Sequence, residues 1–277
     1  IKLYSGNSTN NTAITNDGNS DLQPDWIWAK SRTNTHYHDL RDSTRGVTKR
    51  LVSNEADTES TKDQSYVSFD SDGFTLGDDT DSGGSALNTI NTSSNNYVAW
   101  QWKANGGTTS SNSSGSITST VQANTTAGFS IVTYTGNGSQ GATIGHGLGA
   151  TPNVVLVKGR SIGDSWTMLH TGIASDFQTD MLKLDEDVAV TDSNVFWNDT
   201  APTSSVFTVD GAGGETKVNA NTYTYVAYCF TEIQGYSKFG SYTGNGNADG
   251  PFVYTGFKPA WIMLKRTDSA NNWHIND

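Results

Sequence analysis

The chain contains little sulfur and little proline. Its 277 residues include one cysteine, three methionines and five prolines. One cysteine excludes an intrachain disulfide framework, so stability must come from packing, size or assembly. Cys229 stands in an apolar run, and we expect it to be a small buried hydrophobic side chain. No stretch is long and apolar enough to predict a membrane span.

Positive charge is also scarce. The chain has 17 lysines and arginines against 28 acidic residues, which gives a formal net charge of −11. A nucleic-acid partner requires a basic face, and the densest basic stretch, Arg45–Arg50, is too small to provide one. We therefore expect no nucleic-acid binding. An acidic surface of this kind suits a secreted or particle-bound protein.

Aromatic residues and glycine are abundant instead. Aromatics make up 10% of the chain, and there are 29 glycines. A core can be built from Trp, Tyr and Phe, each of which buries about 150–250 Å². Apolar runs of strand length alternate with clusters of Gly, Asn, Asp and Pro, and only residues 175–184 suggest a short helix or turn. This pattern predicts an all-β fold of tandem antiparallel β-sandwich modules, of the jelly-roll or lectin-like kind.

The sequence repeats itself. Pro24 is followed 73 positions later by Tyr97, and Pro152 is followed 73 positions later by Tyr225, so both landmarks recur after 128 residues. A third copy starts with Tyr242–Asn245 and stops near its middle, and we expect it to continue beyond the last residue. Such a period predicts a string of similar β-modules, and so favours a binding or structural role over a single active site.

The repeat divides the chain into four parts. We predict a first β-sandwich module over residues 1–104, a Ser/Gly-rich linker with an extra strand over 105–127, a second module over 128–233 and a truncated third module over 234–277. Pro152 and Pro259 are 107 positions apart, because the linker has no counterpart between the second and third copies. Loose coupling of the first two modules and tight coupling of the last two are therefore expected.

Certain polar and aromatic residues recur in each copy. A lysine stands six positions after the proline, an aromatic residue follows it, and histidines lie nearby. One interpretation is a ligand site in each module; the other is that these side chains complete each strand and cover one face. The candidate ligand-binding set is Lys30, Tyr37, Lys158, Trp166, His170, Lys265, Trp273 and His274.

Evidence for metal binding and catalysis is thin. Clustered aspartates can supply the oxygen ligands of Ca²⁺, but the EF-hand spacing is absent, and a solvated loop explains the cluster equally. The weak calcium candidates are Asp70, Asp72, Asp78, Asp79 and Asp81. The glycine-rich stretch 145–149 lacks the Lys-Ser/Thr ending of a P-loop, and no serine nucleophile elbow is present. We therefore assign no catalytic residue and no other cofactor.

Five segments point to a known group of proteins. The stretch 127–138 together with Ile144–Gly149, the strand Tyr225–Phe230, and the segments 235–246 and 250–257 resemble repeats in large virion proteins of marine tailed bacteriophages, which are described as tail-fibre-like or of unknown function. The match covers 118–276 and weakens over 1–103.

The resemblance implies a function and partners. It implies a non-enzymatic virion structural protein of the particle surface, in a tail fibre or appendage, with a host-attachment role through carbohydrate binding. Other virion proteins and host-surface glycan would be its partners, and homo-oligomers, including trimers, are typical of such fibres. The alternatives are a capsid decoration or purely architectural subunit, and a polysaccharide depolymerase.

Overall fold

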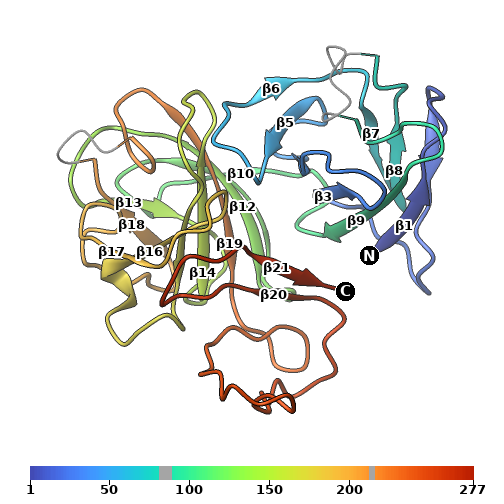
Figure 1. Cartoon of the computed structure of the whole chain (residues 1–277). Helices are drawn as coiled ribbons and strands as arrows, with labels where there is room; N and C mark the ends of the chain where they lie inside the picture. The colour runs from blue at the N-terminus through green and yellow to red at the C-terminus, as the bar shows by residue number, and fades with distance from the viewer. Residues whose placement is uncertain (81–88, 212–215) are drawn as a thin grey trace.

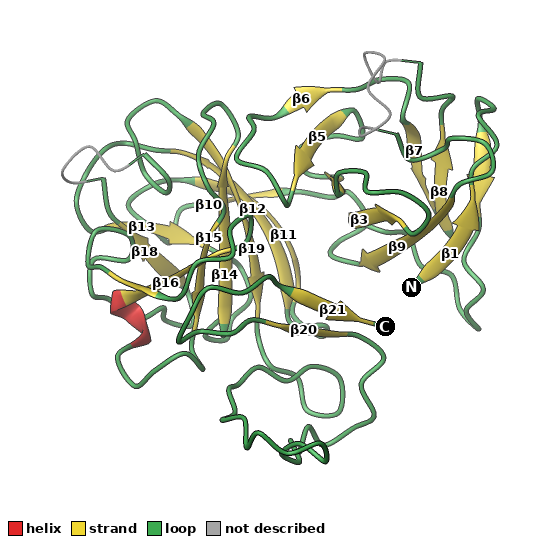
Figure 2. Ribbon diagram, viewed as in Figure 1, coloured by secondary structure: helices red, strands yellow, loops and turns green. Residues whose placement is uncertain are grey.

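The fold is built almost entirely from antiparallel strands. The computed structural model describes residues 1–80, 89–211 and 216–277, with 36% of these residues in strands and 1% in helix (Figures 1 and 2). The helical part is a short 3-10 turn, Phe177–Thr179, inside the predicted helical stretch. The all-β prediction is thus confirmed, whereas the jelly-roll assignment and the predicted module boundaries stay predictions.

Two sheets form the first repeat (residues 1–104). The larger has six strands in the order β1 (Lys2–Ser5), β9 (Asn96–Trp102), β3 (Trp26–Ser31), β4 (Asp39–Asp42), β5 (Lys49–Val52) and β6 (Ser60–Thr61). The smaller has three, in the order β2 (Thr12–Ile14), β8 (Gly73–Leu76) and β7 (Tyr66–Asp70). A core of aromatic and aliphatic side chains lies between them.

The second repeat (residues 128–233) has a similar plan, with two strands of the preceding segment added to its large sheet and, within the described residues, two strands instead of three in its small sheet. Its eight-stranded sheet has the order β10 (Ser110–Asn112), β11 (Ser119–Asn124), β12 (Phe129–Thr135), β19 (Thr224–Phe230), β14 (Val154–Gly159), β15 (Thr167–His170), β16 (Asp180–Lys183) and β17 (Thr191–Asp192). Facing it are β13 (Ala142–Gly145) and β18 (Val206–Val209). The extra strand expected near 117–121 is confirmed as β11.

The third repeat (residues 234–277) contributes one hairpin, β20 (Ile262–Leu264) and β21 (His274–Asn276). Met263 pairs with Ile275 in this hairpin, as Leu156 pairs with Met168 between β14 and β15. The hairpin is therefore the third copy of the β3–β4 and β14–β15 hairpins. In Figure 1 it lies beside the two larger sheets, close to the C-terminus.

Hydrogen bonds and ring contacts repeat along with the strands. Tyr4 stacks on Tyr97 and Tyr134 stacks on Tyr225, with centroids 5.1 Å apart in both pairs. The first tyrosine of each pair donates its hydroxyl to a main-chain oxygen, that of Ile90 or of Val218. Gly6 and Gly136 follow these tyrosines by two positions, and a Cβ there would collide with the carbonyl oxygens of Thr92 and Ala220. The repeated Tyr-Ser/Thr-Gly-Asn motif is thus a packing motif.

A further hydrophobic core is shared by the three repeats and joins them to one another. Along β3, Ile27 and Ala29 point into the core of the first repeat, while Trp26 and Trp28 point into a core shared with Phe129, Leu156, Tyr228 and hairpin β20–β21. Because β3 is buried on both faces, it reads as a continuous apolar run in the sequence. The expected loose coupling of the first two repeats is wrong, since one face of each of their large sheets is buried in this shared core.

Candidate functional site at the junction of the repeats

Two recurrent side chains of the second repeat form hydrogen bonds to the first repeat. Trp166 is fully buried, and its Nε1 donates to the carbonyl oxygen of Val52 at 2.7 Å. Lys158 is also fully buried, and its Nζ donates to the carbonyl oxygen of Ala56 at 2.9 Å. Both acceptors belong to the end of β5 and the loop that follows it. Val52 is buried, so its main-chain oxygen needs a partner, and here the neighbouring repeat provides it.

The third repeat forms equivalent hydrogen bonds to the second. Trp273 Nε1 donates to the carbonyl oxygen of Lys183 at 2.8 Å, and Lys265 Nζ donates to that of Asp187 at 3.3 Å. Asp39 pairs with Val52 as Thr167 pairs with Lys183, so these acceptors are the counterparts of Val52 and Ala56. The tryptophan and the lysine therefore form a recurring clamp from one repeat to the preceding one.

Burial sets the protonation of the clamp lysine. Removal from water lowers the pKa of Lys158 to about 8, although Asp185, Asp164 and Asp57 favour its charged form. Burial also lowers the pKa of Lys265, which is less enclosed. Lys158 additionally donates to the carbonyl oxygen of Asp164 in its own repeat. The ammonium thus bridges two repeats through main-chain oxygens.

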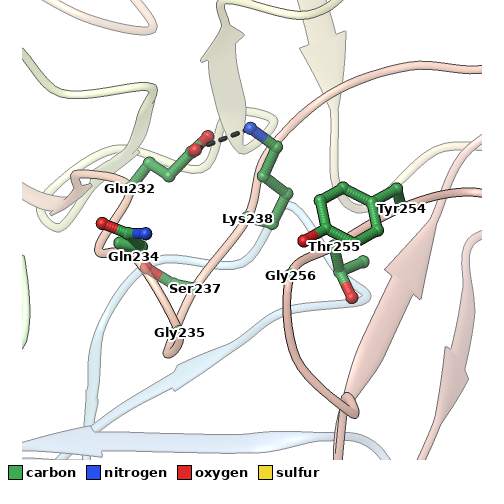
Figure 3. A pocket seen from close by; sticks show the side chains of 8 residues that line it. All are labelled: Glu232, Gln234, Gly235, Ser237, Lys238, Tyr254, Thr255 and Gly256. Atoms are coloured by element: carbon green, nitrogen blue, oxygen red, sulfur yellow. Dashed lines mark hydrogen bonds and ion pairs between the residues drawn. The ribbon is translucent and has the colours of Figure 1, made fainter.

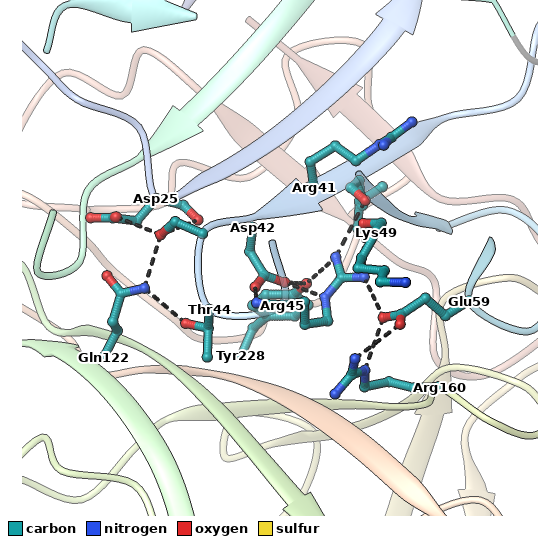
Figure 4. A network of polar contacts seen from close by, with 12 residues as sticks. Asp25, Arg41, Asp42, Thr44, Arg45, Lys49, Glu59, Gln122, Arg160 and Tyr228 are labelled. Carbon is teal, nitrogen blue, oxygen red and sulfur yellow. Dashed lines mark hydrogen bonds and ion pairs between the residues drawn. The ribbon is translucent and has the colours of Figure 1, made fainter. Parts of the chain in front are cut away.

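A buried ionic network reinforces the first interface (Figure 4). Arg45 is enclosed on all sides and pairs with Asp42, while Tyr228 of the second repeat donates its hydroxyl to the same carboxylate at 2.6 Å. Arg45 also reaches Glu59 at 2.9 Å, and Glu59 in turn binds Arg160 of the second repeat at 2.9 Å. Removing one member of such a buried network leaves an unpaired charge.

Asp25 fixes the connection between the repeats. This fully buried carboxylate accepts hydrogen bonds from the backbone N–H groups of Ala104, Gly106 and Gly107 at 2.7–2.9 Å. Gln122 of β11 completes the joint by donating to the hydroxyl groups of Ser43 and Thr44. The Ser/Gly-rich segment predicted as a linker is therefore tied to the first repeat at its start and paired into the second sheet further on.

The candidate residues of the first repeat occupy different surroundings. Lys30 Nζ donates to the carbonyl oxygens of Ser31 and Asn34 in its own repeat. The strand registers show that His38, and not Tyr37, occupies in the first repeat the position that Trp166 and Trp273 occupy in the other two. His38 Nδ1 accepts from Trp28 Nε1 at 2.8 Å, and burial lowers the pKa of His38 to about 4. Tyr37 lies half-buried beside this position.

The remaining two candidates lie apart from the clamps. His170 is half-buried, its Nδ1 accepts from the Gly172 N–H, and its ring contacts Phe239 edge-on at 6.2 Å. Burial lowers the pKa of His170. His274 lies on β21 and is exposed. The eight predicted residues are thus not assembled into one ligand site per repeat, and ligand binding by them stays a prediction.

A cleft of about 440 Å³ opens where the three repeats meet. It is lined by Trp28, Lys30, His38, Ser53, Asn54, Trp100, Leu184, Asp185, Glu186, Asp187, Met263, Asn272, Trp273 and Ile275. Lys30 and Trp273 are the sequence-predicted residues that it brings together.

A second hollow of about 310 Å³ lies at the surface of the third repeat (Figure 3). Tyr254, whose side chain is 77% exposed, forms one wall, and Gln234, Ser237 and Thr255 add polar groups. Lys238 and Glu232 form an ion pair at 2.6 Å across the same hollow. It combines an exposed ring with amide, hydroxyl and charged groups.

The aspartates proposed for calcium are held by protein donors. Asp70 accepts from Ser68 and Thr75, and Asp79 accepts from the backbone of Ile90 and Asn91. Asp72 accepts from Leu22 and Asp78 from Thr80, while Asp81 lies outside the described residues. Within 1–80, 89–211 and 216–277, no group of three or more His, Cys, Asp or Glu side chains is arranged to hold a metal ion.

Comparison with known proteins places the chain in a family. Residues 1–277 match the family described as Domain of unknown function (DUF7483). The chain belongs to this family. No curated protein and no solved structure matches it. Within the described residues of this DUF7483 member, no helix is long and apolar enough to cross a membrane.

Sequence patterns did not identify several residues of the junction. Asp25 and Arg45 serve the first interface alone, so no repeated polar pattern marks them, whereas Asp42 has one acidic counterpart, Asp277. One signal was present: Asp25 and Asn153 both follow the landmark proline. Cys229 is buried as expected, and burial raises the pKa of its thiol to about 12.

Proposed function

We propose that this DUF7483 chain is an architectural component of a bacteriophage particle, part of a tail fibre or appendage. The observation that carries the proposal is the recurring clamp of Trp166 on Val52 and Trp273 on Lys183. The most recurrent side chains join one repeat to the next, so their recurrence serves assembly. Resemblance to virion repeats supplies the setting.

Electron microscopy of labelled particles tests this role. Antibody raised against the 277-residue chain is applied to purified phage particles whose genome encodes it. Gold label along a fibre or appendage is expected. Label spread over the head shell would favour the capsid-decoration alternative, and unlabelled particles with the protein absent from their peptide spectrum would contradict a virion role.

Attachment to host glycan is a second candidate, and the hollow beside Tyr254 favours it. Ligand sites combine apolar or aromatic walls with a few convergent polar groups, and this hollow offers an exposed ring with the amide of Gln234 and two hydroxyl groups. A glycan array compares the chain with Tyr254→Ala and with the control Tyr242→Ala, which removes an exposed tyrosine outside the hollow. A hit lost in the first variant alone is expected, and an array without hits would contradict glycan binding.

A further inference from the structure

The glycine-rich turn 145–149 contains a histidine that is enclosed on all sides. His146 directly follows β13 and has no exposed surface. Its Nε2 lies 3.2 Å from the carbonyl oxygen of Thr203, and its Nδ1 lies 3.2 Å from the backbone nitrogen of Leu148. The backbone nitrogen of His146 donates to the carbonyl oxygen of Ser205, also at 3.2 Å. Both ring nitrogens are therefore occupied by main-chain groups of the second repeat.

These partners fix the protonation state of the ring. A carbonyl oxygen only accepts, so Nε2 carries the hydrogen, and a backbone N–H only donates, so Nδ1 carries none. Both bonds exist together only in the neutral Nε2–H form of His146. A proton added to Nδ1 would point at the N–H of Leu148, and that hydrogen bond would be lost. The turn is thus closed by a neutral imidazole.

No counter-ion stands ready for a charged His146. The segments that pack at this turn are 105–124 with β10 and β11, 142–151 with β13, and 200–209 with β18, and they contain no other ionisable side chain. The carboxylates of Asp199 and Asp210 flank the last segment, and neither is among the groups that shift the pKa of His146. Burial lowers this pKa, and the hydrogen bond to Thr203 raises it by a smaller amount.

Strands β10 and β11 pack against the turn. Gly147 has a φ of +73°, and a Cβ at this position would lie 2.8 Å from a methyl carbon of Val121 in β11. A Cβ at Gly145 would lie 2.2 Å from the side-chain oxygen of Asn112 in β10. Ser119 of β11 donates its hydroxyl to the carbonyl oxygen of Gly145 at 2.7 Å. The position of both strands therefore depends on the closed shape of the turn.

The same two strands form one end of the second sheet, away from the clamps (Figure 2). β11 carries Gln122, which joins the first two repeats by donating to Ser43 and Thr44. Lys158 on β14 and Trp166 beside β15 lie beyond β12 and β19 in the order of the sheet. The end that contains β10 and β11 can therefore open while the clamps stay in place.

We propose that His146 is an acid-sensitive latch: protonation of its Nδ1 breaks the bond from Leu148, opens the turn 145–149 and releases β10 and β11 from it, while the clamps of Trp166 and Lys158 stay closed. The released strands lie in a segment rich in Ser, Thr, Asn and Gly, which is flexible when unpaired. Release also removes the contact of Gln122 with the first repeat. Acid thereby converts a fixed connection between the first two repeats into a flexible one.

The direction of the pH effect follows from the shift. Histidine titrates near 6.5 in an unfolded chain, and the closed turn lowers the pKa of His146 below that value. Below pH 6.5 the opened turn binds a proton that the closed turn excludes, so the free energy of opening falls as the pH falls. One proton changes the opening equilibrium by at most about tenfold per pH unit.

Hydrogen exchange of the 277-residue chain at pH 7.5 and 5.5 tests the latch. After correction for the intrinsic effect of pH on exchange, the opening equilibrium of the β11 amides and of Leu148 is expected to rise by about three- to tenfold at the lower pH, with β14 unchanged. His146→Gln places a side-chain amide that does not titrate in the turn, so its β11 amides should lose this pH dependence. His170→Gln, which removes the other histidine of the second repeat, should keep it.

The imidazole gives a second readout that requires no variant. NMR of protein labelled with ¹⁵N-histidine is expected to show His146 as the Nε2–H tautomer at pH 7, with a titration that coincides with the opening of β11. An Nδ1–H tautomer or an imidazolium at pH 7 overturns the proposal, and so does an equal pH dependence of β11 in the parent and in His146→Gln. Opening of β14 together with β11 would mean that acid unfolds the whole sheet, which overturns it as well.

Discussion

Trp166 and Val52 are 114 positions apart in the chain, yet the indole Nε1 of one donates to the main-chain oxygen of the other at 2.7 Å inside a closed interface. Trp273 and Lys183 repeat the relationship at 2.8 Å one repeat later. A contact that recurs between successive copies is a property of the repeat itself. It explains why tryptophan recurs at this position without any ligand being required.

Replacing Trp166 with phenylalanine should destabilise the protein. The change keeps a ring in the interface but leaves the buried carbonyl oxygen of Val52 without its donor, which costs about 1–3 kcal/mol. Urea denaturation measures the loss. Trp273→Phe is the matched variant, and because Trp273 is half-exposed, water can replace part of its bond. An equal loss of stability in both variants would contradict the expectation that burial makes the hydrogen bond of Trp166 the more costly one to lose.

Asp25 should contribute more to the stability of the fold than its counterpart Asn153. Asp25→Ala removes the acceptor of the Ala104 and Gly106 N–H groups and leaves the Gly107 N–H with Gln122 alone, so a loss of about 3 kcal/mol or more is expected. Asn153→Ala removes an acceptor for the backbone N–H of Glu232 and a donor to Thr171, with an expected loss of about 1 kcal/mol. Thermal unfolding of the two variants compares them, and a larger loss in Asn153→Ala would refute the assignment.

Stability should depend on pH through Lys158. Lysine titrates near 10.5 in the unfolded chain, and burial lowers the pKa of Lys158 to about 8 in the folded one. Between these values the unfolded chain binds more protons, so the free energy of unfolding contributed by this group rises with pH. Denaturation of the parent and of Lys158→Met from pH 7.5 to 10.5 should show a steeper rise in the parent. Parallel curves would mean that Lys158 titrates normally.

Arg45 at the first interface should contribute far more to stability than an arginine at the surface. Arg45→Ala leaves Asp42 buried without its cation, and breaking such a pair costs about 3–5 kcal/mol. Arg266 forms an exposed pair with Asp268 at 2.6 Å, and Arg266→Ala should change stability too little to measure. Chemical denaturation at low and high salt distinguishes the two, since screening by salt acts on the exposed pair.

Prediction from sequence succeeded where local pattern decides structure. Short apolar runs between turn residues predicted strands, and β3, β14 and β19 lie where those runs are. The repeat predicted equivalent strands 128 residues apart, and the registers of β3 with β9 and of β14 with β19 agree. Coupling between repeats was misjudged, because composition alone could not reveal that Trp26, Trp28 and Tyr228 share one core.

The sequence by itself determined that the protein is a β-repeat, because strand-length apolar runs and a fixed spacing of Pro and Tyr are local properties. Only the tertiary structure decided what the recurrent Lys and Trp contact. Their partners are main-chain oxygens of Val52, Ala56, Lys183 and Asp187. Every residue carries such an oxygen, so no residue type marks these acceptors in a sequence, and the contact emerges only when one repeat folds against the next.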